Sequence, residues 1–149
     1  QVASDAHTEG EWTECYTAAR GKRFHYRINT HGIYLDDGRH YPIGLINSML
    51  AHLQHQFASG QFPLANSATK VRSGESRPGI GSAYFKETGR KGNPPDTSAL
   101  VAVLHELGAL AYTPGSPEPW SINFPVFAVE APLDISALFA REFELNEEL

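Results

Sequence analysis

Six lysine and arginine side chains are concentrated between residues 70 and 91, in a chain whose net charge is −5. The same segment contains only two acids, four glycines and the aromatic pair Tyr84-Phe85. Cationic side chains neutralise phosphates, and glycines let backbone N–H groups approach phosphate oxygens closely. This composition therefore predicts a surface that binds a polyanion. The six cations are Lys70, Arg72, Arg77, Lys86, Arg90 and Lys91.

The charge of the whole chain is distributed in three blocks. Residues 1–19 contain four acids and no lysine or arginine, and residues 92–149 contain nine acids and one arginine. Residues 20–91 contain eleven basic groups and four acids. Because salt screens charges over about 8 Å, a local basic face can bind a polyanion despite the negative total. The alternative is that the acidic ends serve only to keep the chain in solution.

Histidine and acidic side chains offer a different chemistry, namely metal binding or acid–base catalysis. His52 and His55 are three residues apart on one predicted helix, but the sequence places no third ligand beside them. His105-Glu106 resembles the start of a zinc-binding His-Glu-x-x-His helix, yet Ala109 occupies the place of the second histidine. The sequence therefore predicts no metal and no cofactor, and an enzyme with a histidine or metal site remains one alternative.

Nucleolytic and nucleophilic motifs are also incomplete. Residues 32–34 (Gly-Ile-Tyr) and 41–44 (Tyr-Pro-Ile-Gly) are superficially similar to the two halves of the GIY-YIG nuclease signature, but Pro42 interrupts the second half. The chain has no Glu-x-Lys sequence and no GxxxxGK[ST] phosphate loop. Cys15 has no catalytic motif around it, and a lone cysteine excludes an internal disulfide. We therefore predict no catalytic residue and favour a binding domain over an enzyme.

The sequence pattern predicts an α+β fold, with a mostly antiparallel sheet and about three helices. Alternating residues indicate a first strand over 11–17 and a β-meander over 22–41. Residues 58–81, rich in glycine, serine, proline and asparagine, are interpreted as a long loop. Further strands are predicted over 82–87 and 120–130.

Three helices are predicted from apolar residues that recur at helical spacing. The first covers residues 43–57, beginning after Pro42. The second follows Asp96 as N-cap and is expected to continue until Pro114-Gly115. A last helix is predicted after Asp134. These helices and the sheet would position the basic segment.

A length of 149 residues suits a single domain of globular composition. The chain lacks a long apolar run and a basic start followed by an apolar segment, so we expect neither a transmembrane helix nor a signal peptide. The lone cysteine favours a cytoplasmic location. The chain does not begin with methionine, and we interpret it as a fragment of a larger protein.

The basic segment contains a motif that resembles part of a known family. The motif is Gly81-x-x-Tyr84-Phe85-x-x-Thr88-Gly89-Arg90-Lys91. It is similar to a motif in the N-terminal recognition domain of McrA-type (HNH) modification-dependent restriction endonucleases. The resemblance implies a domain that reads modified cytosine in duplex DNA, whereas a separate HNH domain cuts. The chain contains no HNH motif and no cysteine pairs for the usual zinc, so the resemblance implies a reader without its nuclease module.

Looser similarities to the family lie elsewhere in the chain. Tyr41-Pro42 before a helix is similar to the sulphur pocket of McrA-type domains that read phosphorothioate backbones. Ile122-Asn123-x-Pro125 and Arg141-Glu142 are similar to the family's segment downstream of the motif. Residues 97–121 are an insertion relative to the family pattern.

These observations lead to one preferred interpretation, a DNA-binding domain for 5-methylcytosine or a related modification in double-stranded DNA. It involves no membrane and allows a homodimer. The alternative from a different class is a protein-interaction module whose basic loop contacts an acidic partner. The predicted DNA-binding residues are Arg39, Lys70, Arg72, Arg77, Thr88, Gly89, Arg90 and Lys91. The predicted modification pocket consists of Tyr41, Pro42 and Tyr84, whereas Phe85 is assigned to the core.

Overall fold

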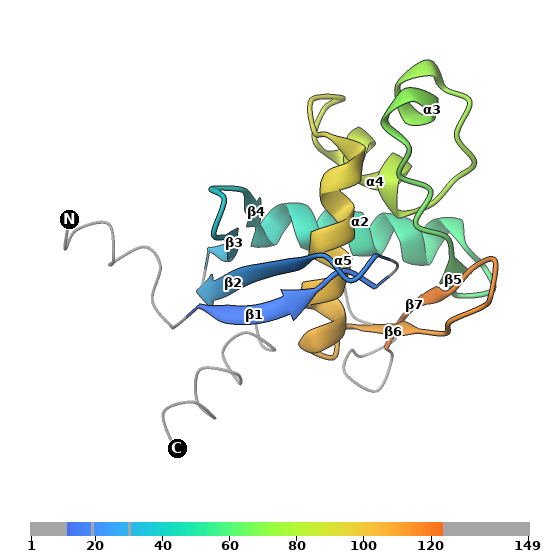
Figure 1. Cartoon of the computed structure of the whole chain (residues 1–149). Helices are drawn as coiled ribbons and strands as arrows, with labels where there is room; N and C mark the ends of the chain where they lie inside the picture. Colours follow the sequence, from blue (N-terminus) through green and yellow to red (C-terminus); the bar gives the residue numbers. More distant parts are fainter. Residues whose placement is uncertain (1–11, 19, 30, 124–149) are drawn as a thin grey trace.

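A four-stranded antiparallel sheet occupies the first part of the domain (Figure 1). The computed structural model of the chain describes residues 12–18, 20–29 and 31–123. Within them the sheet follows the chain order, which confirms the predicted first strand and meander. Phe24, Tyr26 and Ile28 lie on the buried face, as their alternation requires. The strands are β1 (Thr13–Tyr16), β2 (Arg23–Asn29), β3 (Gly32–Leu35) and β4 (His40–Pro42).

Helix α2 (Ile43–Gln56) follows the sheet directly and confirms the first predicted helix. Pro42 is its N-cap residue, in an extended conformation that fits the position before a first turn. The buried side of the helix repeats every three to four residues, which is the amphipathic spacing that predicted it. The residues on that side are Ile46, Met49, Leu50 and Leu53.

The next segment differs from its prediction. Strand β5 (Gln61–Phe62) and helix α3 (Ala68–Ser73) interrupt the long loop expected over 58–81. Helix α4 (Ile80–Glu87) replaces the strand expected over 82–87, so both predictions are wrong. Its buried residues include Ile80, Ala83 and Tyr84, which are spaced as on one side of a helix. The strand predicted over 82–87 did not include Ile80, so this helical spacing was not recognised.

The second half continues through the 3₁₀ turn η1 (Pro94–Asp96) into helix α5 (Thr97–Glu106). The helix was predicted to continue until Pro114. It ends before Gly108 instead, because Gly108 adopts a left-handed conformation with φ of 86°. The chain then forms β6 (Leu110–Tyr112) and β7 (Trp120–Ile122), and β7 pairs antiparallel with both β5 and β6 in the order β5-β7-β6. Strand β7 confirms the start of the strand predicted over 120–130, and the helix predicted after Asp134 lies outside the described residues.

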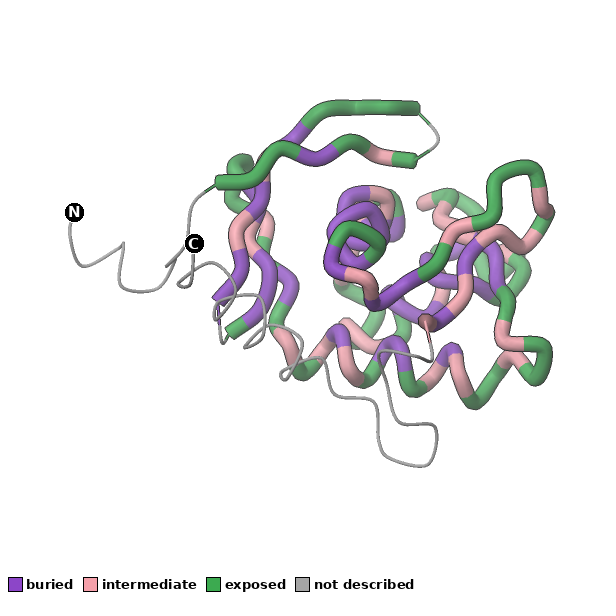
Figure 2. Tube along the Cα trace, turned by 90° about the horizontal axis from the view of Figure 1, so that it is seen from below, coloured by how far each residue is buried: buried purple, intermediate pink, exposed green. Residues whose placement is uncertain are grey.

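Helix α5 is the centre of the domain. It contacts β1, β6, η1 and α4, and Figure 2 shows it nearly end-on with other elements around it. Seven of its ten residues are buried, so it is covered on more sides than an ordinary amphipathic helix. They are Thr97, Ala99, Leu100, Val101, Ala102, Val103 and Leu104.

No helix in the described ranges combines the length and the apolar character that a bilayer crossing needs.

Two glycines allow the start of α4 to lie directly against residues 63–66. Ile80 and Gly81 donate backbone hydrogen bonds to the carbonyls of Pro63 (3.0 Å) and Leu64 (2.7 Å). A Cβ atom on Gly81 would lie 2.5 Å from the carbonyl oxygen of Ala65, and one on Gly79 would lie 2.6 Å from that of Pro63. Only glycine fits such close backbone contacts.

Replacement of Gly81 by alanine tests this contact. Gly81→Ala should lower the free energy of unfolding by about 1–3 kcal/mol, because the new methyl group forces the backbone of residues 65–66 to move. The matched control is Gly44→Ala in α2, where the added methyl group meets nothing within 4 Å. The control should gain up to about 1 kcal/mol from helix propensity. Urea denaturation measures both variants, and equal effects of the two would contradict the packing described here.

Candidate functional site

The six cations of the basic segment lie on consecutive elements at one end of the domain. Lys70 and Arg72 are in the last turn of α3, and Lys86 is in the last turn of α4. Arg77 is in the loop between these helices, and Arg90 and Lys91 follow α4. All six are exposed. Figure 1 shows α3 and the loop after α4 on the same side of the molecule. We call these six residues the basic end.

The charges of the basic end are not compensated by neighbouring acids. None of its six side chains forms an ion pair with a carboxylate in the part of the chain that the structure describes. By contrast, Arg23 pairs with Glu14 at 3.6 Å, and Arg39 pairs with two aspartates. Arg23 and Arg39 therefore have acidic partners, whereas the cations of the basic end form no ion pair with a described carboxylate.

The three arginines of the basic end make contacts with neutral groups that orient their side chains. Arg72 donates from Nη2 to the side-chain oxygen of Asn93 at 2.9 Å, which ties α3 to the loop after α4. The Arg90 guanidinium lies 5.0 Å from the centre of the Phe85 ring. Arg77 donates to the carbonyl of Pro117 at 3.4 Å. Neutral partners of this kind hold the side chains without cancelling their charge.

The glycines of the segment have a different role from the predicted one. The N–H groups of Gly74, Gly79, Gly81 and Gly89 all donate within the chain. Their acceptors are the carbonyls of Val71, Leu64 and Lys86 and the hydroxyl of Ser82. These N–H groups are therefore already occupied in the structure, contrary to the prediction that they are open to phosphate oxygens.

The remaining motif residues shape the loop after α4. Gly89 and Arg90 both have left-handed backbone conformations, with φ of 69° and 67°. The Thr88 hydroxyl donates to the carbonyl of Phe85 (2.9 Å) and accepts from the N–H of Gly92 (2.8 Å). This loop presents Arg90 and Lys91 to solvent, and DNA contact by Thr88 and Gly89 remains a prediction.

The aromatic residues predicted to line a modification pocket lie in the core. Tyr41 is 1% exposed and Tyr84 is 6% exposed, with ring centres 6.2 Å apart. The Tyr41 hydroxyl donates to the carbonyl of Asp96 at 2.8 Å. Burial raises the pKa of both tyrosines. Pro42 is exposed. A modified base would reach Tyr41 or Tyr84 only after a change in this packing, so their role in such a pocket remains a prediction.

Arg39 joins the meander to the start of α5. Its Nε lies 2.9 Å from Oδ2 of Asp37, and its Nη1 lies 3.1 Å from Oδ1 of Asp96. The hydrogen bond from Arg39 lowers the pKa of the Asp37 carboxyl. Asp96 is the N-cap residue of α5, as predicted, but its carboxylate makes no cap hydrogen bond and binds Arg39 instead. Arg39 thus has its charge compensated, unlike the basic end.

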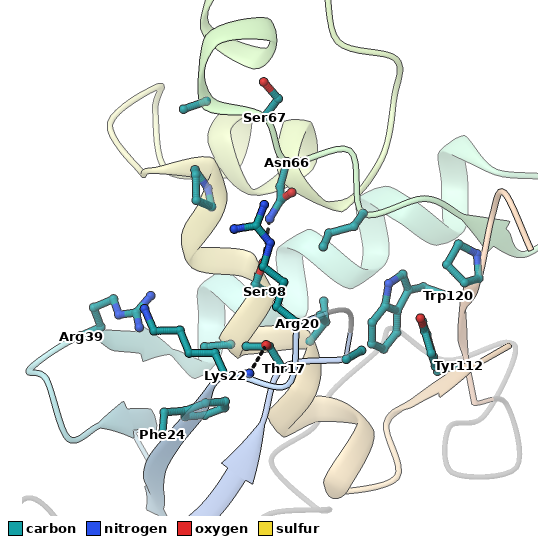
Figure 3. A pocket seen from close by; sticks show the side chains of 17 residues that line it. Thr17, Arg20, Lys22, Phe24, Arg39, Asn66, Ser67, Ser98, Tyr112 and Trp120 are labelled. Carbon is teal, nitrogen blue, oxygen red and sulfur yellow. Dashed lines mark hydrogen bonds between the residues drawn. The ribbon is translucent and has the colours of Figure 1, made fainter. Parts of the chain in front are cut away.

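Figure 3 shows a groove with a volume of about 740 Å³. Its walls are the turn between β1 and β2, residues 64–68 and the strands β6 and β7, and its floor is one side of α5. Arg20, Lys22 and Arg39 contribute cations to it. Of these, only Arg39 was predicted as a site residue. The run Arg20-Gly21-Lys22-Arg23 is the sequence signal that could have indicated the other two.

A smaller hollow of about 440 Å³ adjoins the groove. It is lined by Lys70 and Arg77 of the basic end, together with Glu75. Asn66 and Ser67 line both the groove and this hollow, so the two are neighbours at residues 66–67. Lys70 and Arg77 of the basic end therefore lie close to the groove.

The histidines do not form a metal site in the described ranges. No group of three or more histidine, cysteine, aspartate or glutamate side chains is placed to hold an ion there. His52 and His55 lie on α2 with no such third ligand. His105 lies in the last turn of α5 with its ring edge-on to Tyr112 and Trp120, at centre distances of 6.4 and 6.3 Å.

The fold and the site define an α+β domain with an uncompensated basic surface and an adjoining groove. Comparisons of the chain with protein-family models, with curated proteins and with solved structures found no match.

The buried tyrosines predict how stability changes at alkaline pH. Their folded-state pKa values are raised, so the folded protein holds these protons more tightly than the unfolded chain does. The free energy of unfolding should therefore fall as the pH rises above about 10, the ordinary tyrosine pKa. Denaturation at several pH values, with tyrosinate absorbance as a second signal, measures this loss.

Replacement of Tyr41 measures how much this residue contributes to the loss of stability at alkaline pH. Tyr41→Phe should cost about 0.5–1.5 kcal/mol near neutral pH, because the hydrogen bond to Asp96 is lost. It should also reduce the loss of stability above pH 10. Tyr16→Phe, at a side chain that is 53% exposed, is the matched control for removal of a hydroxyl. An unchanged alkaline loss in Tyr41→Phe would contradict this assignment.

Proposed function

We propose that this chain is a DNA-binding domain that recognises modified duplex DNA. The observation that supports DNA binding is the uncompensated charge of the basic end, whose six exposed cations have no ion-pair partner among the described carboxylates. Uncompensated neighbouring cations repel one another and reduce stability. Their presence on α3, on α4 and in the loops before and after α4 is explained if a polyanion neutralises them.

The arrangement of the cations suits phosphate contacts better than contacts with a single small anion. They extend from α3 across the loop before α4 to the loop after it, and Arg72 joins the two ends through Asn93. Successive phosphates of a DNA backbone offer charges over such a distance. Arg72, Arg77 and Arg90 are already oriented by neutral contacts, so less side-chain freedom is lost on binding.

Recognition of a modification rests on the similarity of residues 81–91 to the McrA-type reader motif. Arg90 and Lys91 are the last two residues of that motif, and both are exposed in the loop after α4. Burial of a methyl group provides only about 0.8 kcal/mol, so a reader of 5-methylcytosine also needs contacts to the base edge. Arginine bound to guanine adds about 1–3 kcal/mol of discrimination. In this proposal the nuclease module belongs to a separate domain.

Binding to one duplex in four forms tests the proposal. The forms are unmodified, 5-methylcytosine, 5-hydroxymethylcytosine and phosphorothioate, and fluorescence anisotropy is measured between low and physiological salt. We expect tighter binding to a modified form, with a steep dependence on salt. Arg90→Ala combined with Lys91→Ala should reduce the log–log salt slope by about 1.8, because each phosphate contact contributes about 0.9. Arg23→Ala, at an exposed arginine paired with Glu14, is the control and should leave the slope unchanged.

The possible results separate the parts of the proposal. Equal affinity for all four forms would support DNA binding but contradict recognition of a modification. An unchanged slope in the Arg90 and Lys91 double variant would remove the assigned surface. No binding to any duplex at low salt would reject the proposal and favour an acidic protein as the partner of the basic end.

A further inference from the structure

The groove between the β1–β2 turn and α5 has dimensions that suit a nucleotide. Its volume of about 740 Å³ is within the range of about 300–1,000 Å³ that is usual for sites of small ligands. A double helix is far larger than this space, whereas a single nucleotide fits within it. Its floor is formed by Pro95 of η1 and by Ser98, Ala99 and Val101 of α5, of which Ser98 is half-buried and the other two α5 residues are buried.

The electrostatics of the groove favour an anionic ligand. The described residues that line it include three cations and no aspartate or glutamate. Arg39 has its charge compensated by Asp37 and Asp96. Arg20 and Lys22 are exposed and have no ion pair with a described carboxylate. A phosphate between Arg20 and Lys22 would supply the missing charge.

The other end of the groove offers an aromatic surface. In Figure 3, Tyr112 and Trp120 lie together at the end opposite Lys22 and Arg39. Their ring centres are 4.5 Å apart, and Trp120 is 2% exposed, so it supports the more exposed ring of Tyr112. Flat rings of this kind stack on nucleobases regardless of base type. Between the two ends, Asn66 and Ser98 place an amide and a hydroxyl, joined by a hydrogen bond of 3.0 Å.

The groove lies next to the surface assigned to DNA. Asn66 and Ser67 line both the groove and the hollow that contains Lys70 and Arg77. A strand with phosphates at Lys70 and Arg77 would therefore pass close to the groove. This proximity favours a nucleotide that belongs to the bound DNA over a separate small molecule.

We infer that the groove receives the modified nucleotide after it has left the base stack, with its phosphate at Arg20 and Lys22 and its base against Tyr112. The inference rests on the proposed DNA binding and adds the mode of recognition. It places the modified base at a surface that is open in this structure, whereas Tyr41 and Tyr84 are buried. A modified base that pairs weakly would enter most readily, because less pairing energy is lost.

A duplex with 2-aminopurine beside the modified cytosine tests the inference. Fluorescence of 2-aminopurine rises when a neighbouring base leaves the stack, and anisotropy measures binding in the same sample. The wild-type chain should produce a several-fold rise in fluorescence on binding. The double variant Arg20→Ala, Lys22→Ala should lose most of this rise yet still bind through the basic end. Arg23→Ala, an exposed cation that does not line the groove, is the matched control and should behave as wild type.

A second variant tests the space itself. Ser98→Leu adds bulk to the floor of the groove on the half-exposed side of α5. It should also abolish the fluorescence rise while the anisotropy change persists, and circular dichroism verifies that the variant is folded. Loss of the rise in both variants would support the inference.

The results distinguish this inference from the proposed function. Binding of wild-type protein without a rise in fluorescence would overturn the groove as a nucleotide site and leave DNA binding intact. An equal rise in wild type and in the Arg20 and Lys22 variant would also overturn it, because the base would then be held elsewhere. Failure to bind any duplex would reject both proposals.

Discussion

The burial of helix α5 is the constraint on which the rest of the structure depends. Leu100, Val103 and Leu104 are fully buried, and Ala99 and Val101 on other sides of the helix are nearly so. Apolar burial contributes about 25 cal/mol per Å², so elements from both halves of the chain gain stability by covering this helix. Strands β1 and β6 and helix α4 provide the cover. The groove lies beside α5 at Ser98, the half-buried residue of the helix that lines it, with the buried Ala99 and Val101 next to it.

The cover of α5 also determines where charges are compensated. Arg39 connects β4 to the start of α5 through Asp96, and the Tyr41 hydroxyl binds the carbonyl of the same residue. At this junction the ion pair between Arg39 and Asp96 holds two parts of the fold together. The basic end lies beyond it, on short elements whose contacts to neutral groups leave the cations uncompensated. The ion pairs of Arg39 thus lie apart from the unpaired cations of the basic end, and this difference supports the proposed function.

The sequence predicted those elements whose pattern is local and long enough to read. The meander over 22–41 and helix α2 follow from alternation and helical spacing within single segments. Helix α4 was missed because Gly79 and Gly81 indicate a loop, whereas they permit close contact with residues 63–66. Helix α5 is shorter than predicted because Gly108 adopts a left-handed conformation, although apolar residues continue at helical spacing after it. The basic end was identified from composition alone. The groove was not, because residues from Thr17 to Trp120 form it and no local spacing reveals such a site.

A nuclear magnetic resonance titration with modified duplex DNA tests the central claim most directly, since it shows both whether DNA binds and where. Our account predicts that backbone amide signals shift most at residues 66–77 and 88–93, with smaller shifts in the turn between β1 and β2. Signals from the β2–β3 turn and from the exposed side of α2 should change little. Shifts confined to those regions, or no shifts at all at low salt, would contradict the assignment of the basic end as a DNA-binding surface.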